Sequence, residues 1–348
     1  MKNVSNSEFS HGDSYFNFSK PNTELIDFSS SINQSSKELI GNEFLKELEH
    51  YPQPENVFEK KIAQNLDLNE EKITVFAGMT SLIYSVFKLS GIKRALFLEP
   101  LFSEYMRSSL GMGIESVRLP VNQLLHNPKL LRSFNYDIAC LNNPVNPTGE
   151  FIDKDHLIEL IEECQRSDSL FFLDEAYIDF ISKSLRFNSI KFLDRFRNLI
   201  IGRSFTKIGG LPGIRLGYSV TSEDLGERLK FLRPPWTIPQ SYLKVDISKF
   251  FDIEIPYLEK ERDRLIHSLR ELGLRIIGNS VSNMISFSTQ NLIDPDQFER
   301  KLIDDGFLVR NLSNFYGFNH NEFRIGVKTP EDNKKLISAI KRILDVKG

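Results

Sequence analysis

Short apolar runs alternate with amphipathic segments between about residues 73 and 220. The apolar runs lie at 94–98, 138–141, 170–173, 199–202 and 216–220. Between them, segments such as 102–110 and 155–165 repeat apolar residues at helical spacing. Strands that are apolar on both faces and alternate with helices are typical of a mostly parallel sheet with helices on both sides. We therefore expect an α/β fold in this part of the chain.

The pattern changes after the turn-forming run RPPWTIPQ at 233–240. A helix is expected over 256–272, where charged residues separate leucines at helical spacing. Short strands at 275–277, 284–288 and 323–327 then alternate with helices at 294–305 and 331–346. We expect residues 51–240 to form a large domain and residues 241–348 a small α+β domain. Residues 1–50 are polar and irregular, with a short helix at 41–49, and are expected to form an N-terminal arm that joins the small domain.

Composition narrows the function classes. The chain has 348 residues, of which 40% are hydrophobic and 26% charged, so it has enough apolar side chains for a folded core. A net charge of −3 argues against a nucleic-acid-binding protein. Two cysteines cannot form a metal cluster or a disulfide framework. No apolar run approaches the roughly 20 residues that span a bilayer, and the polar N-terminus does not resemble a signal peptide. We expect a cytoplasmic protein without a metal.

Two motifs follow apolar strands directly. NNPVNPTG at 142–149 contains two Asn-Pro steps, which would display the amides of Asn143 and Asn146 at the carboxyl end of a strand. FFLDEAYIDF at 171–180 places Asp174 and Glu175 at the end of the next strand, where a desolvated carboxylate needs a cationic partner. Each motif alone is equally consistent with an ordinary role, as a polar turn and as a helix cap respectively.

Two further motifs are rich in glycine. RSFTKIGGLPGIRLGY at 203–218 places Ser204, Lys207 and Arg215 around a turn after an apolar strand, an arrangement that suits a reactive lysine beside a phosphate. VFAGMTSLIYSVF at 75–87 predicts a strand that ends at Gly78 and a helix whose first amides face outward, a natural phosphate site. Taken singly, a solvated lysine and an ordinary capped helix explain these motifs as well.

The order of the four motifs is more specific than any one of them. In this order they resemble the fold-type I pyridoxal 5'-phosphate (PLP) enzymes of the aminotransferase class I/II group. The resemblance covers nearly the whole chain. It implies a large domain with a mostly parallel seven-stranded sheet, a small α+β domain built from both chain ends, and a homodimer with shared active sites.

The resemblance also implies a role for each motif residue. Lys207 is implied to carry PLP covalently, and Asp174 to pair with its pyridine nitrogen. Asn146 and Tyr177 are implied to bind the phenolic oxygen of PLP. The implied phosphate ligands are Ser204, Arg215 and the amides of Gly78, Met79 and Thr80. Phe102 would stack on the ring, and Tyr51 would reach the cofactor phosphate of the partner subunit.

Four segments resemble one branch of this group, the threonine-phosphate decarboxylases of cobalamin biosynthesis. They are HGDSYFNF at 11–18, IDFSSSIN at 26–33, PLFSEY at 100–105 and VRNLSNFYGFNHNEFRIGV at 309–327. Histidinol-phosphate aminotransferases are near relatives, but they typically carry Asn-Glu-Asn-Pro where this chain has SSIN, and Pro-Thr-Tyr where it has PLF. The decarboxylases usually begin with His-Gly-Gly-Asn, whereas this chain has His-Gly-Asp-Ser.

The implied substrate is a small phosphorylated amino acid, O-phospho-L-threonine or O-phospho-L-serine. Arg324 matches the arginine that binds the substrate carboxylate, and Arg310 would take the phosphate. His11 and Asn33 are further candidates for substrate contact. The alternatives are a surface salt bridge for Arg310 and a solvated loop histidine for His11. No motif separates decarboxylation from transamination, so a histidinol-phosphate aminotransferase is the second hypothesis.

Overall fold

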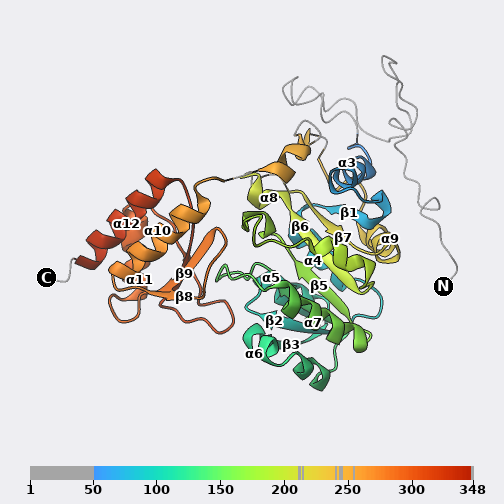
Figure 1. Cartoon of the computed structure of the whole chain (residues 1–348), viewed down its shortest axis with the longest axis horizontal. Coiled ribbons are helices and arrows are strands. Elements are labelled where there is room, and N and C mark those ends of the chain that lie inside the picture. Colours follow the sequence, from blue (N-terminus) through green and yellow to red (C-terminus); the bar gives the residue numbers. More distant parts are fainter. Residues whose placement is uncertain are drawn as a thin grey trace, which may run out of the picture.

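The structure is a computed structural model that describes residues 51–345 except 211, 212, 214, 240, 243–245 and 254. The expected arm, its helix at 41–49, and the candidates His11 and Asn33 lie outside the described residues. Figure 1 shows two lobes. The large lobe contains β1–β7 with α3–α9, and the small lobe contains β8–β11 with α10–α12.

The large lobe is built on a seven-stranded sheet in the order β1-β7-β6-β5-β4-β2-β3. Its strands are β1 (Ile73–Phe76), β2 (Arg94–Glu99), β3 (Glu115–Pro120), β4 (Ile138–Asn142), β5 (Leu170–Asp174), β6 (Leu199–Ser204) and β7 (Gly217–Val220). All run in one direction except β7, which pairs antiparallel with β1 and β6. The expected mostly parallel sheet is confirmed. The antiparallel direction of β7 and the half-exposed edge strand β3 were not expected from the sequence.

Helices cover both faces of this sheet (Figure 1). They are α3 (Asn56–Leu66), α4 (Gly78–Phe87), α5 (Ser103–Gly111), α6 (Val121–His126), α7 (Lys154–Arg166), α8 (Phe205–Ile208) and α9 (Glu223–Leu232). Short 3-10 helices lie at Glu70–Lys72, Pro128–Ser133, Ile178–Phe180, Ser189–Asp194 and Ile247–Asp252. Along β5, Phe171 and Leu173 pack into one core with α3 and α7, whereas Phe172 packs into a second core with α4 and α5. This two-residue alternation explains why the central strands read as unbroken apolar runs.

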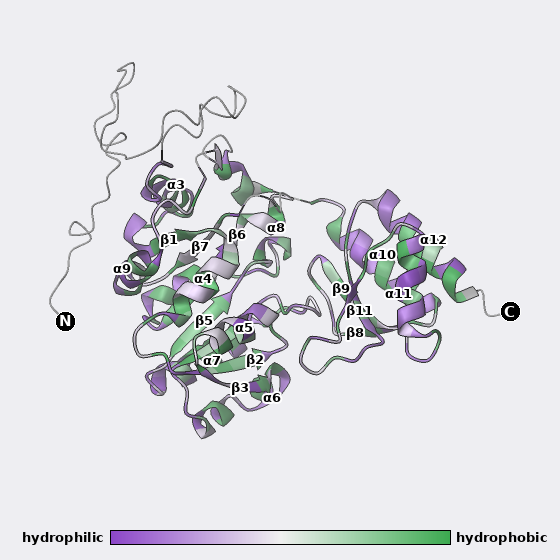
Figure 2. Ribbon diagram, turned by 180° about the vertical axis from the view of Figure 1, so that it is seen from behind, coloured by the Kyte–Doolittle hydropathy of each residue, from purple (hydrophilic) through white to green (hydrophobic). Residues whose placement is uncertain are grey.

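The small lobe has an antiparallel sheet in the order β10-β11-β9-β8. Its elements are α10 (Leu258–Glu271), β8 (Arg275–Ile277), β9 (Met284–Ser288), α11 (Pro295–Asp304), β10 (Arg310–Asn311), β11 (Glu322–Gly326) and α12 (Pro330–Asp345). The three helices cover the side of this sheet turned away from the large lobe (Figure 1). The rings of Phe287, Phe298 and Phe323 meet at the centre of its core. Figure 2 shows the apolar residues of both lobes gathered on the strands and inner helix faces.

The expected division into a larger sheet unit and a smaller α+β unit agrees with this architecture, while the boundary at residues 240/241 stays a prediction. In the described part of the chain, no helix combines the length and apolarity needed to cross a membrane.

Candidate active site

The loops after β1, β4, β5 and β6 meet at one edge of the large sheet, because these strands are parallel and have their carboxyl ends there. Together with β10 and β11 they enclose a cavity of about 280 Å³. The residues predicted from the sequence that line it are Met79, Thr80, Phe102, Asn146, Asp174, Tyr177, Ser204, Lys207, Arg215, Arg310 and Arg324. The structure therefore brings four separate motifs into one site.

Asp174 is the last residue of β5 and is 7% exposed. Its carboxylate accepts hydrogen bonds from the Tyr105 hydroxyl and from the backbone N–H of Ala176, each at 2.9 Å. Burial raises the pKa of Asp174 to about 6, although both hydrogen bonds and the charge of Lys207 lower it. Among the described residues, no arginine, lysine or histidine forms an ion pair with Asp174. The site thus holds a buried carboxylate whose two hydrogen bonds both come from neutral donors.

Glu175, the next residue, is equally buried but fully paired. Arg203 donates to it at 2.9 Å, and the Ser189 hydroxyl donates at 2.6 Å. Burial alone would lower the pKa of Arg203, but the adjacent charge of Glu175 raises it above its ordinary value. Of the two adjacent carboxylates, the fold provides a cation for Glu175 and leaves Asp174 facing the cavity.

Lys207 lies in α8, the short helix that follows β6 without a loop. Ser204 caps this helix, because its hydroxyl oxygen accepts a hydrogen bond from the Thr206 N–H at 3.3 Å. The Lys207 side chain is exposed to the cavity, and its Nζ lies 5.6 Å from the centroid of the Tyr177 ring. An amine is thereby held above the same strand ends as Asp174.

The N-terminus of α4 and Arg215 form another wall of the cavity, where hydrogen-bond donors and a positive charge suit an anion. α4 begins at Gly78, whose φ of +81° favours glycine. A Cβ at Gly78 would lie 2.8 Å from Nη2 of Arg215, and a Cβ at Gly217 would lie 3.2 Å from the Met79 nitrogen. Gly78 thus allows the Arg215 guanidinium to approach the N-terminus of α4, and Gly217 allows the backbone of β7 to lie against the first residues of the same helix. Backbone amides, a guanidinium and the Thr80 side chain then face one place.

Arg310 and Arg324 reach the cavity from the small lobe. They are directly paired residues on the antiparallel strands β10 and β11, so their side chains leave the same face of the sheet. Arg324 donates a hydrogen bond to Oδ1 of Asn146. Burial lowers the pKa of Arg324, and the positive charge of Arg310 lowers it further. Two cations at such short range are stabilised when anionic groups lie between them.

The Asn-Pro motif is only partly as expected. Asn146 lines the cavity, but Asn143 does not display its amide there. Its side chain turns back into the large lobe, where it donates to the Ile152 carbonyl at 3.0 Å and accepts from the Ile152 N–H at 2.8 Å. That expectation for Asn143 was wrong, because both of its polar groups are used to hold the loop.

Tyr51 does not line the cavity of its own chain; its ring stacks on Trp236 at a centroid distance of 4.5 Å. Its implied contact with a partner subunit, and the homodimer itself, stay predictions.

Tyr105 is the functional residue that the sequence analysis missed. It lies on α5, one turn after Phe102, with its ring buried against Phe97 and Phe172 and its hydroxyl on Asp174. Burial raises the pKa of Tyr105 well above its usual range, so it stays a hydrogen-bond donor. The spacing of Phe102 and Tyr105 in PLFSEY was the available signal, because residues three apart share a helix face.

Comparison with known proteins agrees with this geometry. The sequence family "Aminotransferase class I and II" matches residues 42–340. The chain belongs to the aminotransferase class I and II family. Among its relatives is a protein of Caldanaerobacter subterraneus subsp. tengcongensis provisionally named threonine-phosphate decarboxylase, 29% identical over 82% of this chain and 80% of the relative. Another is histidinol-phosphate aminotransferase 2 of Legionella pneumophila, 28% identical over 84% of this chain and 81% of the relative.

The fold of this class I and II family member also matches solved structures. The L-threonine-O-3-phosphate decarboxylase of Porphyromonas gingivalis superposes with a TM-score of 0.77 at 22% identity, covering 87% of this chain and 93% of that one. The resemblance stated from the motifs is confirmed at the level of family and fold.

PLP is the cofactor of this family, and the cavity fits it. A buried carboxylate without a cation matches a protonated pyridine nitrogen, and the amides of α4 with Arg215 match a phosphate. Lys207, Asn146 and Tyr177 line the space between these two ends. The chain is therefore a PLP-dependent enzyme of the aminotransferase class.

Proposed function

We propose that this enzyme decarboxylates O-phospho-L-threonine or O-phospho-L-serine and so produces an amino-alcohol phosphate for cobamide biosynthesis. The observation that carries the proposal is the pairing of Arg310 with Arg324 across β10 and β11, where both residues line the cavity from the small lobe. A phosphorylated amino acid has a carboxylate and a phosphate, and the two guanidinium groups can take one each.

The remaining site residues each have a role in holding the cofactor. Lys207 would attach the cofactor, Asp174 would pair with its ring nitrogen, and Ser204, Arg215 and the first amides of α4 would hold its phosphate. When bound, PLP would supply an electron sink for the bond that breaks at Cα. Arg324 and Arg310 hold both ends of the substrate and thereby fix rotation about the N–Cα bond. The substrate carboxylate can then be presented for loss as CO₂, and Lys207 returns a proton to Cα.

Two relatives support this reaction. One is the provisionally named threonine-phosphate decarboxylase. The other is the adenosylcobalamin biosynthesis bifunctional protein CobDQ of Leptospira interrogans, 29% identical over 92% of this chain but only 39% of that longer protein. The first name gives the reaction, and the second gives adenosylcobalamin biosynthesis as the pathway.

Histidinol-phosphate aminotransferase is the second candidate, supported by the relatives with that name. Histidinol phosphate carries a phosphate but no α-carboxylate, so only one of the two arginines would bind its anionic group. Its amino acceptor would occupy both arginines in the second half of the reaction.

Product analysis separates the two candidates. Purified enzyme with PLP is incubated with O-phospho-L-threonine or O-phospho-L-serine, and CO₂ and the amine product are followed. In parallel, histidinol phosphate is supplied with 2-oxoglutarate, and glutamate is followed. We expect CO₂ release without any need for 2-oxoglutarate. Glutamate formation from histidinol phosphate, with no CO₂ from either phosphoamino acid, would replace the proposal with the second candidate.

A further inference from the structure

The loop between β10 and β11 controls the surroundings of Arg310. Nη2 of Arg310 donates a hydrogen bond to Oδ1 of Asn314 at 2.9 Å, and its guanidinium carbon lies 5.9 Å from the centroid of the Phe315 ring. Phe315 is buried and lines the cavity beside Arg310. The direction in which Arg310 points therefore depends on where this loop lies.

Tyr316, the next residue of the loop, contacts the large lobe. Its ring lies 4.4 Å from the guanidinium carbon of Arg118 on the edge strand β3. Tyr316 is 39% exposed, and neither Tyr316 nor Arg118 lines the cavity that holds Lys207. The contact joins the two lobes outside the site.

Arg118 is itself held in place by Glu99. Nε of Arg118 donates to Oε1 of Glu99 at 2.6 Å, and Oε2 of Glu99 accepts from the Leu101 N–H at 2.6 Å. Leu101 directly precedes Phe102, which lines the cavity. Continuous contacts thus run from Tyr316 through Arg118 and Glu99 to the wall of the site.

A second cavity of about 280 Å³ lies at this junction. Arg118 and Glu99 line it from the large lobe, and Asn314 lines it from the loop. It shares Phe102 and Ser103 with the first cavity. The loop therefore bridges a partly hollow boundary, where a lost contact leaves it room to shift.

We propose that Tyr316, stacked on the Arg118–Glu99 pair, is a positioning residue that holds Arg310 in place and thereby sets the preference for phosphorylated substrates. The inference rests on the proposed role of Arg310 as the phosphate ligand. A tyrosine ring over a paired arginine suits this task, because the pair fixes the guanidinium plane against which the ring lies. The residue acts through Asn314 and Phe315 and does not touch the substrate.

The test compares Tyr316→Leu with Tyr316→Phe, which keeps the aromatic face. Tyr257→Leu is a matched control, because Tyr257 is 38% exposed and lies at the start of α10, outside both cavities. For each variant, kcat and KM are measured with the phosphorylated substrate that the wild type turns over and with its unphosphorylated counterpart. PLP affinity and Tm are measured alongside.

We expect Tyr316→Leu to lower kcat/KM for the phosphorylated substrate about 5- to 30-fold, mainly through KM, the range that a cation–π contact supports. Activity on the unphosphorylated substrate and PLP affinity should change by less than about twofold. Tm should change by less than about 2 °C. Tyr316→Phe and Tyr257→Leu should resemble the wild type. In an Arg310→Ala background, Tyr316→Leu should add no further loss.

Equal losses on both substrates, an equal loss in Tyr316→Phe, or an additive loss in the Arg310→Ala background would each overturn the proposal. This test of Tyr316 can be carried out whether or not the proposed decarboxylase function is correct. If the enzyme turns out to transaminate histidinol phosphate, the same comparison is made with histidinol phosphate and histidinol. If Arg310→Ala lowers activity equally on phosphorylated and unphosphorylated substrates, Arg310 is not the phosphate ligand, and the proposal for Tyr316 is overturned with it.

Discussion

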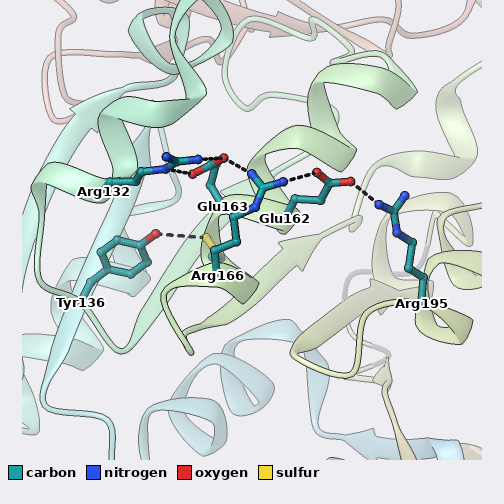
Figure 3. A network of polar contacts seen from close by, with 7 residues as sticks. Arg132, Tyr136, Glu162, Glu163, Arg166 and Arg195 are labelled. Carbon is teal, nitrogen blue, oxygen red and sulfur yellow. Dashed lines mark hydrogen bonds and ion pairs between the residues drawn. The ribbon is translucent and has the colours of Figure 1, made fainter.

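Two buried carboxylates in the large lobe have opposite surroundings. Glu163 on α7 accepts hydrogen bonds from Nε and Nη2 of Arg132 at 2.5 and 2.9 Å, and Arg166 donates to it from the other side (Figure 3). Arg166 also pairs with Glu162, which continues the network to Arg195. The Arg132 hydrogen bonds and the two positive charges lower the pKa of Glu163.

Asp174 has no such partner among the residues that the structure describes, and burial raises its pKa to about 6. The difference is instructive because both carboxylates are at least nine-tenths buried. Where a carboxylate is structural, the fold supplies arginines to pair with it. Asp174 faces the cavity instead, so the cation is left for a ligand to bring, and its pKa is raised rather than lowered.

Removing Lys207 should have the largest effect on the site. Lys207→Ala should abolish turnover and the visible absorbance of bound PLP, because the attachment point and the proton donor are lost together. Single-turnover assays and absorbance spectra check this. A variant that kept both the absorbance and the activity would show that another residue binds the cofactor.

Asp174→Asn should leave the fold intact and lower the rate by roughly 10³-fold, because a neutral amide cannot keep the ring nitrogen protonated. The change is nearly isosteric, so the Tm of the apoenzyme should not fall. Near-normal kcat in this variant would mean that Asp174 has only a structural role, as Glu175 does.

Tyr105→Phe should give an intermediate effect. It removes one of the two hydrogen bonds to Asp174 while the ring still fits against Phe97 and Phe172. We expect about a tenfold loss in kcat/KM, the effect of one hydrogen bond to a charged group. In the apoenzyme, the pH profile of PLP binding should move to higher pH, because the pKa of Asp174 rises further without the Tyr105 hydrogen bond. An unchanged profile would assign Tyr105 to packing alone.

Glu163→Gln should have the smallest effect on catalysis, because Glu163 is the structural carboxylate in the comparison with Asp174. The rate should equal that of the wild type, while stability at pH 7 should fall by about 1–2 kcal/mol. A lowered pKa stabilises the folded state above the ordinary value of 4.5, so the difference between variant and wild type should shrink as pH falls from 4.5 toward the lowered pKa of Glu163. Urea unfolding at pH 7 and pH 3.5 measures this difference in stability. A reduced catalytic rate in the variant would show that Glu163 is not purely structural.

Much of the fold could be predicted because the central strands are buried on both faces and the four motifs follow strand ends. The edge strand β3 and the reversed β7 were not predictable, since the first has no apolar run and strand direction depends on distant pairing. In the site, Lys207 and Asp174 stand in distinctive motifs. The partner of Asp174 is Tyr105, 69 residues away, and only the fold brings the two together.

The most direct test of the central claim is the dissociation constant of PLP for the apoenzyme between pH 5 and pH 8, in the wild type and in Asp174→Asn. The raised pKa means that apo Asp174 is protonated below about pH 6, and that proton must leave before the carboxylate can pair with a cation. We predict that the variant binds PLP more weakly than the wild type at pH 8. The pH dependence of the wild-type constant should bend near pH 6, where apo Asp174 titrates, and the variant should lack this bend. Titration of the free cofactor contributes equally to both proteins. A bend of equal size in both proteins, or equal affinities at pH 8, would contradict the claim that Asp174 awaits the charge of the cofactor.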